Sequence, residues 1–389
     1  MNKERFLRRL LALMLFVLSP ALLAAEGPQL FGGTLGRMEV VVELDLRDPE
    51  QVTGRYFYRK YRHDLALEGK LQGAQLSLRE GRERYDDIPR PELQLQRTAQ
   101  GWQGEWRGPQ GKRLVVSLSR LSVEPPPTDD EPFWQRIHAE SPYDFLRLKA
   151  SPLEPSKRQR FMGHELQWWR EPVSGLTAFE VLDGYPPAQL ALINQRLRER
   201  LWTDVIDYHG CKLGGDEFMQ TLKPALLSAQ VVSLDILTSY YCGGAHPDFS
   251  ASPLTLDART GEVLALEDVL WVADGPALLY RDDGEGRPVP GSVDFTTYSD
   301  YRSERLAPWL VEQLGRLYPD RMAEPEDDDC RYADSEVWNF PAWYLTPEGL
   351  HLAPYFARAM RPCDLVDWPV LPYALLKQHP GRLKLRLPE

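Results

Sequence analysis

The chain has 389 residues, of which 43% are hydrophobic and 26% are charged. This length and apolar content exclude an intrinsically disordered chain and allow two or three domains with buried cores. The formal net charge of −11 argues against nucleic acid or anionic lipid as a partner, and it favours cationic partners.

Residues 1–25 have the pattern of a secretory signal peptide. Four basic residues and one acid among the first nine precede an apolar run over 10–23 and small residues at 24 and 25. No Cys follows this run to accept a lipid, and no later segment approaches the ~20 apolar residues that span a bilayer. We therefore expect cleavage after residue 24 or 25, a net charge of −14 once the +3 of the leader is lost, and a periplasmic protein without a membrane span. The alternative is an uncleaved N-terminal anchor.

The four cysteines all lie in the second half of the chain, at Cys211, Cys242, Cys330 and Cys363. In an oxidising compartment an even number of cysteines indicates disulfides. Three pairings are open, and we favour Cys211–Cys242 with Cys330–Cys363 because each closes a loop of about 30 residues, worth about 3 kcal/mol. A metal site is the alternative reading. No Cys-x-x-Cys pair or Cys/His cluster supports it, so we expect no metal.

Residues 26–123 predict a small antiparallel β domain. Short alternating or aromatic runs recur at regular spacing, and glycine-containing pairs such as Glu68-Gly69 and Gln72-Gly73 are interpreted as the turns between them. The expected strands cover 38–46, 54–58, 65–67, 75–78, 102–106 and 114–118. The Pro-rich, acidic segment 124–132 follows, and we place a domain boundary there because such segments favour extended conformations.

The rest of the chain predicts an α+β fold of antiparallel sheets with packed helices, divided into an α+β subdomain at 133–215 and a C-terminal α+β domain at 216–389. Leu190, Ile193, Leu197 and Leu201 recur at helical spacing and predict a helix over 186–208. Further helices are expected at 303–318 and 371–378, and strands at 176–182, 229–241, 249–256, 338–345 and 350–356. No alternation of strand and helix indicates a parallel sheet.

No catalytic signature occurs in the sequence. His164 begins a string like that of a zinc protease, but Trp168 stands where the second His must lie. A nucleophile elbow, a P-loop and a dinucleotide fingerprint are absent. The acidic loops at 282–286 and 324–329 lack the alternating ligand spacing of a calcium loop. We therefore expect a protein that is not an enzyme and has no catalytic residues, metal or cofactor.

The most distinctive string runs from residue 240 to residue 249 and reads Tyr-Tyr-Cys-Gly-Gly-Ala-His-Pro-Asp-Phe. Its two glycines would let the backbone turn where side chains clash, and a disulfide at Cys242 would fix that turn. His246 could contact a ligand, act as a general base, or simply be hydrogen-bonded within the loop. The expected binding residues are Tyr240, Tyr241, Gly243, Gly244, His246 and Asp248.

This string, together with 256–270 and 340–350, resembles the C-terminal domain shared by the anti-sigma factor RsiV and the peptidoglycan deacetylase PdaC. The resemblance extends over roughly residues 133–379 when a smaller associated domain is included. It implies a non-catalytic role, since the deacetylase carries its chemistry in a separate domain and the anti-sigma factor uses this domain as an extracellular lysozyme receptor. No segment here is similar to a sigma-factor-binding region, so control of a sigma factor is not carried over.

Three functions remain open. The first is a periplasmic, non-catalytic binding protein for a cell-envelope component, such as a peptidoglycan fragment, or for a cationic protein such as a lysozyme, which the acidic surface would attract. The second is a structural module that scaffolds envelope proteins. The third is a peptidoglycan-modifying enzyme that uses His246 with Asp248 or another carboxylate.

Overall fold

The structure is a computed structural model that describes residues 27–81, 89–282, 286–325 and 330–387. The predicted signal peptide and parts of both acidic loops lie outside these residues. The chain divides into two compact units: the first comprises residues up to 130 with 134–147, and the second comprises 131–133 with 148–389. No helix of the described residues has the length and apolar content needed to cross a bilayer. The five-part division predicted from the sequence stays a prediction.

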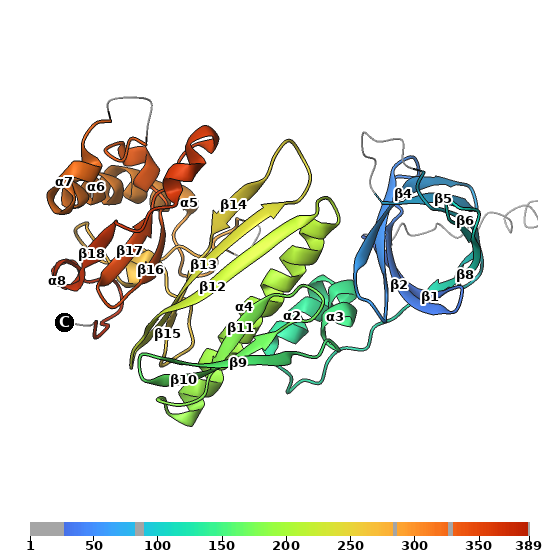
Figure 1. Ribbon diagram of the computed structural model, residues 1–389, viewed down its shortest axis with the longest axis horizontal. Helices are drawn as coiled ribbons and strands as arrows, with labels where there is room; N and C mark the ends of the chain where they lie inside the picture. Colours follow the sequence, from blue (N-terminus) through green and yellow to red (C-terminus); the bar gives the residue numbers. More distant parts are fainter. Residues whose placement is uncertain (1–26, 82–88, 283–285, 326–329, 388–389) are drawn as a thin grey trace, which may run out of the picture. The chain divides into compact units, whose positions relative to one another are not determined.

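Eight antiparallel strands of the first unit close into a barrel (Figure 1). Each strand pairs with the next, and β1 (Gln29–Leu35) also pairs with β8 (Arg113–Arg120). Between them lie β2 (Met38–Asp45), β3 (Val52–Tyr58), β4 (Asp64–Gln72), β5 (Gln75–Glu80), β6 (Glu92–Arg97) and β7 (Gly101–Arg107). Alternate side chains point inward and form an apolar core. The antiparallel strands were predicted, whereas β1, β6 and the closure were not.

Glycines at strand positions help the barrel to close. A Cβ atom at Gly33 would lie 1.9 Å from the carbonyl oxygen of Ser117, and one at Gly69 would lie 1.9 Å from the carbonyl oxygen of Ser77. Neighbouring backbone therefore comes closer at these positions than any side chain would permit. The interpretation of Glu68-Gly69 as a turn is wrong, because both residues lie inside β4.

A buried ionic cluster holds α3 (Pro142–Leu148), which follows α2 (Pro132–Glu140), against the outside of the barrel. Arg147 of α3 donates to Asp64 of β4 and to Asp144, and its side chain is fully buried. Arg55 of β3 donates to Asp144 over 3.1 Å, and the Tyr143 hydroxyl donates to Asp64 over 2.7 Å. Each buried charge thus has an opposite charge within hydrogen-bond distance, which offsets the cost of taking it out of water.

The first part of the second unit packs one long helix with two antiparallel sheets. Helix α4 (Pro187–Lys212) buries Ile193, Leu197 and Leu201, as its sequence predicts. Helix α4 contacts strands of both sheets (Figure 1). The first sheet has the order β11 (Thr177–Val181), β10 (His164–Arg170), β9 (Glu154–Phe161). In the second sheet, β13 (Val231–Tyr241) pairs with β12 (Glu217–Leu227), β14 (Asp248–Ala251) and β15 (Leu254–Asp257). His164 lies on a strand, not on a zinc-protease helix.

The C-terminal part adds a third sheet and short helices around a core that contains Trp338 and Leu310. The sheet has the order β16 (Ala342–Leu345), β17 (Gly349–Ala353), β18 (Val370–Pro372). The helices are η1 (Leu266–Asp268), α5 (Phe295–Tyr301), η2 (Arg302–Leu306), α6 (Ala307–Leu317), α7 (Pro319–Met322), η3 (Ser335–Trp338), η4 (Arg358–Asp364) and α8 (Tyr373–Leu376). The prediction of helices combined with antiparallel sheets is confirmed. The predicted strand at 338–345 begins only at Ala342, because 335–338 form a 3-10 turn that buries Trp338.

His351 of β17 is a buried histidine in surroundings that disfavour the protonated ring. Its side chain stacks on Tyr344 with ring centroids 4.5 Å apart, and its Nε2 lies 3.1 Å from the carbonyl oxygen of Val366. The other ring nitrogen, Nδ1, is buried without a partner among the described residues. Burial lowers the pKa of His351, while the hydrogen bond to the Val366 carbonyl and the Asp235 carboxylate oppose that shift.

We expect the second unit to lose stability as the pH falls below about 6.5, the ordinary pKa of histidine. Below that pH His351 is protonated in the unfolded chain but not in the folded chain. The free energy of unfolding therefore keeps falling until the pH reaches the lowered pKa of the folded state. His351→Phe keeps the ring stacked and should remove this part of the pH dependence. Urea unfolding at several pH values between neutral and mildly acidic measures how the free energy of unfolding changes with pH. If this pH dependence were the same in the variant, the assignment to His351 would be contradicted.

Candidate functional site

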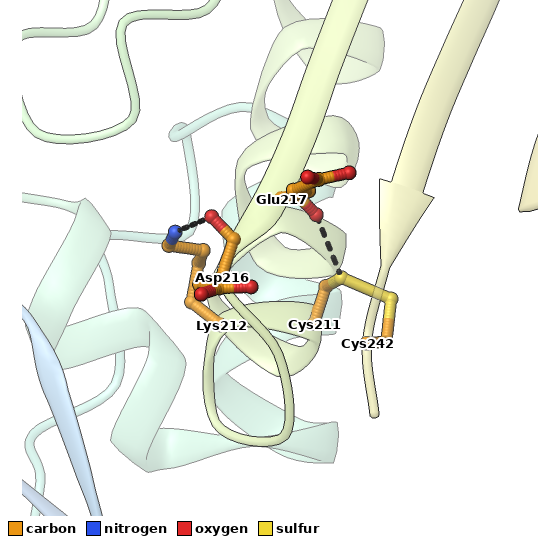
Figure 2. The surroundings of a disulfide bond; sticks show 5 residues. All are labelled: Cys211, Lys212, Asp216, Glu217 and Cys242. Atoms are coloured by element: carbon orange, nitrogen blue, oxygen red, sulfur yellow. Dashed lines mark hydrogen bonds between the residues drawn. A yellow bond between two sulfur atoms is a disulfide. The ribbon is translucent and has the colours of Figure 1, made fainter. Parts of the chain in front are cut away.

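A disulfide holds the base of the predicted binding loop, which connects β13 to β14. Cys242 follows β13 and is bonded to Cys211 in the last turn of α4 (Figure 2). The sulfur of Cys211 lies 3.6 Å from the carbonyl oxygen of Glu217 at the start of β12, and the Lys212 ammonium donates to the carbonyl oxygen of Asp216. The end of α4, the start of β12 and the loop are therefore tied together at one point.

The two glycines of the loop have the backbone conformation expected of them. Gly243 has φ of +91° and Gly244 has φ of +115°, both in the region that side chains disfavour. A Cβ atom at Gly243 would also lie 2.7 Å from the carbonyl oxygen of Gly214. The Tyr241 hydroxyl donates to the Gly244 carbonyl oxygen over 2.9 Å, so this side chain supports the turn. Tyr240 is half-buried on β13, paired with Asp248 of β14.

The second disulfide joins Cys330 to Cys363, and Cys363 lies in η4. Both disulfides are the pairs favoured from the sequence spacing. Disulfides form and persist in oxidising compartments, so the two bonds indicate a location outside the reducing cytoplasm. The two disulfides anchor segments that contact each other, because side chains of η4, which contains Cys363, contact the loop that follows Cys242.

Removing the Cys211–Cys242 disulfide should loosen the loop selectively. Cys211→Ser/Cys242→Ser is expected to cost about 3 kcal/mol of stability and to speed hydrogen exchange at 241–250. Cys330→Ser/Cys363→Ser is a matched control, because it opens a loop of nearly the same length, with a sequence separation of 33 against 31. The control should cost a similar amount in urea unfolding. In the control, exchange at 241–250 should change only through the contacts of η4 with the loop, and so by less than in the Cys211/Cys242 variant. Equal acceleration in both variants would contradict the local role of Cys242.

Arg361 connects η4 to the loop. It donates to the Asp364 carboxylate over 2.7 Å and to the carbonyl oxygen of Phe249, and its Nε lies 3.6 Å from the Asp248 carboxylate. Its guanidinium carbon lies 4.7 Å from the ring centre of Phe249 and 4.6 Å from that of Tyr355. One arginine thus orders both the end of the loop and an aromatic ring outside it.

His246 is exposed and contacts no carboxylate among the described residues. Its Nδ1 lies 2.9 Å from Nη2 of Arg358 and 3.0 Å from the carbonyl oxygen of Pro247. One nitrogen cannot accept from the arginine and donate to the carbonyl at once, so only one of these bonds exists in a given protonation state. The Asp248 carboxylate instead accepts from the backbone N–H of Phe249 over 2.8 Å and lies 3.6 Å from Nε of Arg361. The structure therefore does not join His246 and Asp248 into an acid–base pair.

A cavity of about 620 Å³ lies beside η4. This volume is in the range of ligand pockets. It is lined by charged and apolar side chains, namely Arg331, Asp334, Glu336, Val337, Tyr355, Phe356, Ala357 and Met360. Tyr355 lines this cavity and also lies over the guanidinium group of Arg361, which contacts Phe249 at the end of the loop. We call this cavity, η4 and the loop 240–249 the η4 surface.

Sequence reasoning found the loop but missed the cavity. Its lining comes from three short stretches, at 331–337, 355–357 and 360, and none has a periodic pattern of its own. The available signals were Cys330 and Cys363, which bracket these stretches, and Tyr355, which lies within the range 133–379 of the family resemblance. A search for aromatic residues near the predicted disulfides would have found Tyr355.

Buried carboxylates elsewhere in the second unit serve the fold. Glu267 lies 2.6 Å from Arg302, and Asp204 lies 2.8 Å from Arg200. Burial raises the pKa of both carboxyls, and the paired guanidinium groups oppose that shift. Neither carboxylate lines the cavity. Over the residues that the structure describes, no group of three or more His, Cys, Asp or Glu side chains could hold a metal ion.

No protein-family model matches this chain, and no curated protein matches it. The family resemblance of residues 133–379 therefore stays a prediction.

Proposed function

We propose that this chain is an exported, non-catalytic binding protein that engages its ligand through the η4 surface. The observation that carries this proposal is the cavity beside η4, whose Tyr355 stacks on the same arginine that orders the loop. One disulfide holds the loop at Cys242 and the other holds η4 at Cys363. A surface that is ordered before binding loses less entropy when the ligand binds. Arg361 and Asp248 are occupied by contacts within the protein, which favours a role in shaping the surface over a role in proton transfer.

A basic protein of the lysozyme type is the ligand that charge favours. The chain has a net charge of −11, and two carboxylates line the cavity. Opposite charges speed association and select among partners, and both effects weaken with salt. The resemblance to a receptor domain for lysozyme supports the same ligand, and the predicted leader with the two disulfides supports a periplasmic location.

Titration calorimetry with a basic lysozyme, at low and at physiological salt, tests the proposal. Tyr355→Ala should weaken binding at least about tenfold, as expected for an exposed aromatic contact. The matched control is Tyr61→Ala in the barrel, since the two tyrosines are 62% and 51% exposed. The proposal fails if neither a basic lysozyme nor peptidoglycan fragments bind at low salt. It also fails if both variants weaken binding equally.

A cell-envelope saccharide is the second candidate, and an exposed aromatic cluster favours it. Phe295 and Phe340 are 52% and 43% exposed, and their rings are nearly parallel at 14° with centroids 6.1 Å apart. Tyr298 and Tyr280 extend this cluster. Aromatic faces of this kind pack against sugar rings. Titration with muropeptides should then be sensitive to Phe340→Ala and insensitive to Tyr355→Ala.

A further inference from the structure

We infer that the cavity beside η4 is a site for a cation on an aliphatic stem, as in the side chain of a lysine or arginine in a bound peptide segment. This inference deepens the proposed binding function and rests on it. It names the chemical group that enters the cavity, which is a property of the lining side chains themselves.

The apolar part of the lining suits an aliphatic stem. Val337 and Phe356 are 8% and 5% exposed and belong to the core of the C-terminal part, so their positions are fixed by packing. Met360 is partly buried against the same core. A lysine or arginine places its methylene groups on such a surface while its charged end stays at the edge.

The charged part of the lining selects the sign of the ligand. Asp334 is held in place because its Oδ1 accepts from the backbone N–H of Glu336 over 2.9 Å. The Glu336 carboxylate has no partner among the described residues, and its side chain is exposed. The one cation of the lining, Arg331, lies 3.7 Å from the Glu324 carboxylate. The lining therefore contains two acidic residues against one arginine that already has a carboxylate beside it.

This balance disfavours the other ligand classes. An anionic group would meet two like charges, which costs binding energy. A purely apolar group would take the carboxylates of Asp334 and Glu336 out of water without giving them a partner. A cation on a methylene stem meets both requirements of the lining at once.

The experiment uses the intact chain labelled with ¹³C at its methionine methyl groups, with the Met360 resonance assigned from Met360→Leu. Nα-acetyl-lysine amide, whose side-chain ammonium group is free, should shift this resonance in a saturable way. N-acetyl-norleucine amide has the stem without the ammonium group and should bind at least about tenfold more weakly. Asp334→Asn/Glu336→Gln should weaken the lysine compound by a similar factor.

A matched control removes two acids from another part of the same unit. Asp300→Asn/Glu304→Gln makes the same change in net charge at exposed positions on α5 and η2, and it should leave the Met360 titration unchanged. Equal weakening in both double variants, or equal binding of the norleucine compound, would overturn the inference. If a basic protein or a muropeptide binds and Met360 stays silent with the lysine compound, the inference fails and the proposed function stands. If Met360 responds and neither macromolecular ligand binds, the proposed function fails and the site stands.

Discussion

Replacing Asp64 with asparagine is expected to destabilise the barrel unit by about 3–5 kcal/mol, the cost of breaking a buried ion pair. The substitution keeps the size of the side chain and removes only its charge. Arg147, whose side chain is fully buried, then loses one of its two carboxylate partners, and Arg55 loses a carboxylate 3.7 Å away. Uncompensated charge inside the protein weakens the attachment of α3 to the barrel.

Hydrogen exchange of the intact chain measures this effect, because it reports on the barrel strands separately from the second unit. Exchange should accelerate in α3 and in β3 and β4, which carry the cluster. Asp45→Asn is the matched control, since it removes a carboxylate from an exposed pair with Arg47 on the same barrel and should change little. Similar acceleration in the two variants would show that the buried cluster does not hold α3.

Replacing Arg361 with methionine is expected to abolish most ligand binding and to destabilise the second unit by about 3 kcal/mol. Asp364 is 5% exposed and would lose its cationic partner. Burial already raises the pKa of Asp364, so the variant should take up a proton there more readily. The Phe249 carbonyl oxygen and the Tyr355 ring would lose their contact with η4 at the same time.

Affinity for the basic ligand and hydrogen exchange at 241–250 both measure the consequence of that loss. Arg358→Met is the matched control, because Arg358 also lies in η4 but contacts the loop only through exposed His246. It should leave stability nearly unchanged. If the two variants had equal effects, the surface would depend on the charge of η4 and not on the contacts of Arg361.

Local patterns carried most of the correct sequence predictions. The recurrence of Ile193, Leu197 and Leu201 identified α4, because a buried stripe on one helix is visible in one stretch of sequence. The short separations between cysteines likewise identified both disulfides. Strand β9, with Lys157, Arg158 and Arg160, was missed because an exposed edge strand has no apolar alternation.

Features that depend on distant segments were beyond these patterns. Closure of the barrel pairs Phe31 with Arg120, and nothing in either strand indicates the other. The cavity likewise forms only when Val337 of η3 and Tyr355, which follows β17, come together in the folded chain. The loop 240–249 could be found because its glycines and Cys242 are adjacent in sequence, whereas the arginine that orders it is more than a hundred residues away.

Closure of the barrel also bears on how this chain avoids aggregation. Every strand of the barrel has two hydrogen-bonded neighbours, so its wall presents no row of unpaired amides to which a foreign strand could add. The open sheet that contains β9 has such a row at its margin, and there Lys157, Arg158 and Arg160 place repelling charges along it. The first unit thus has no exposed strand edge in its barrel, and the second unit has an exposed edge whose positive charges repel the same edge of a second copy.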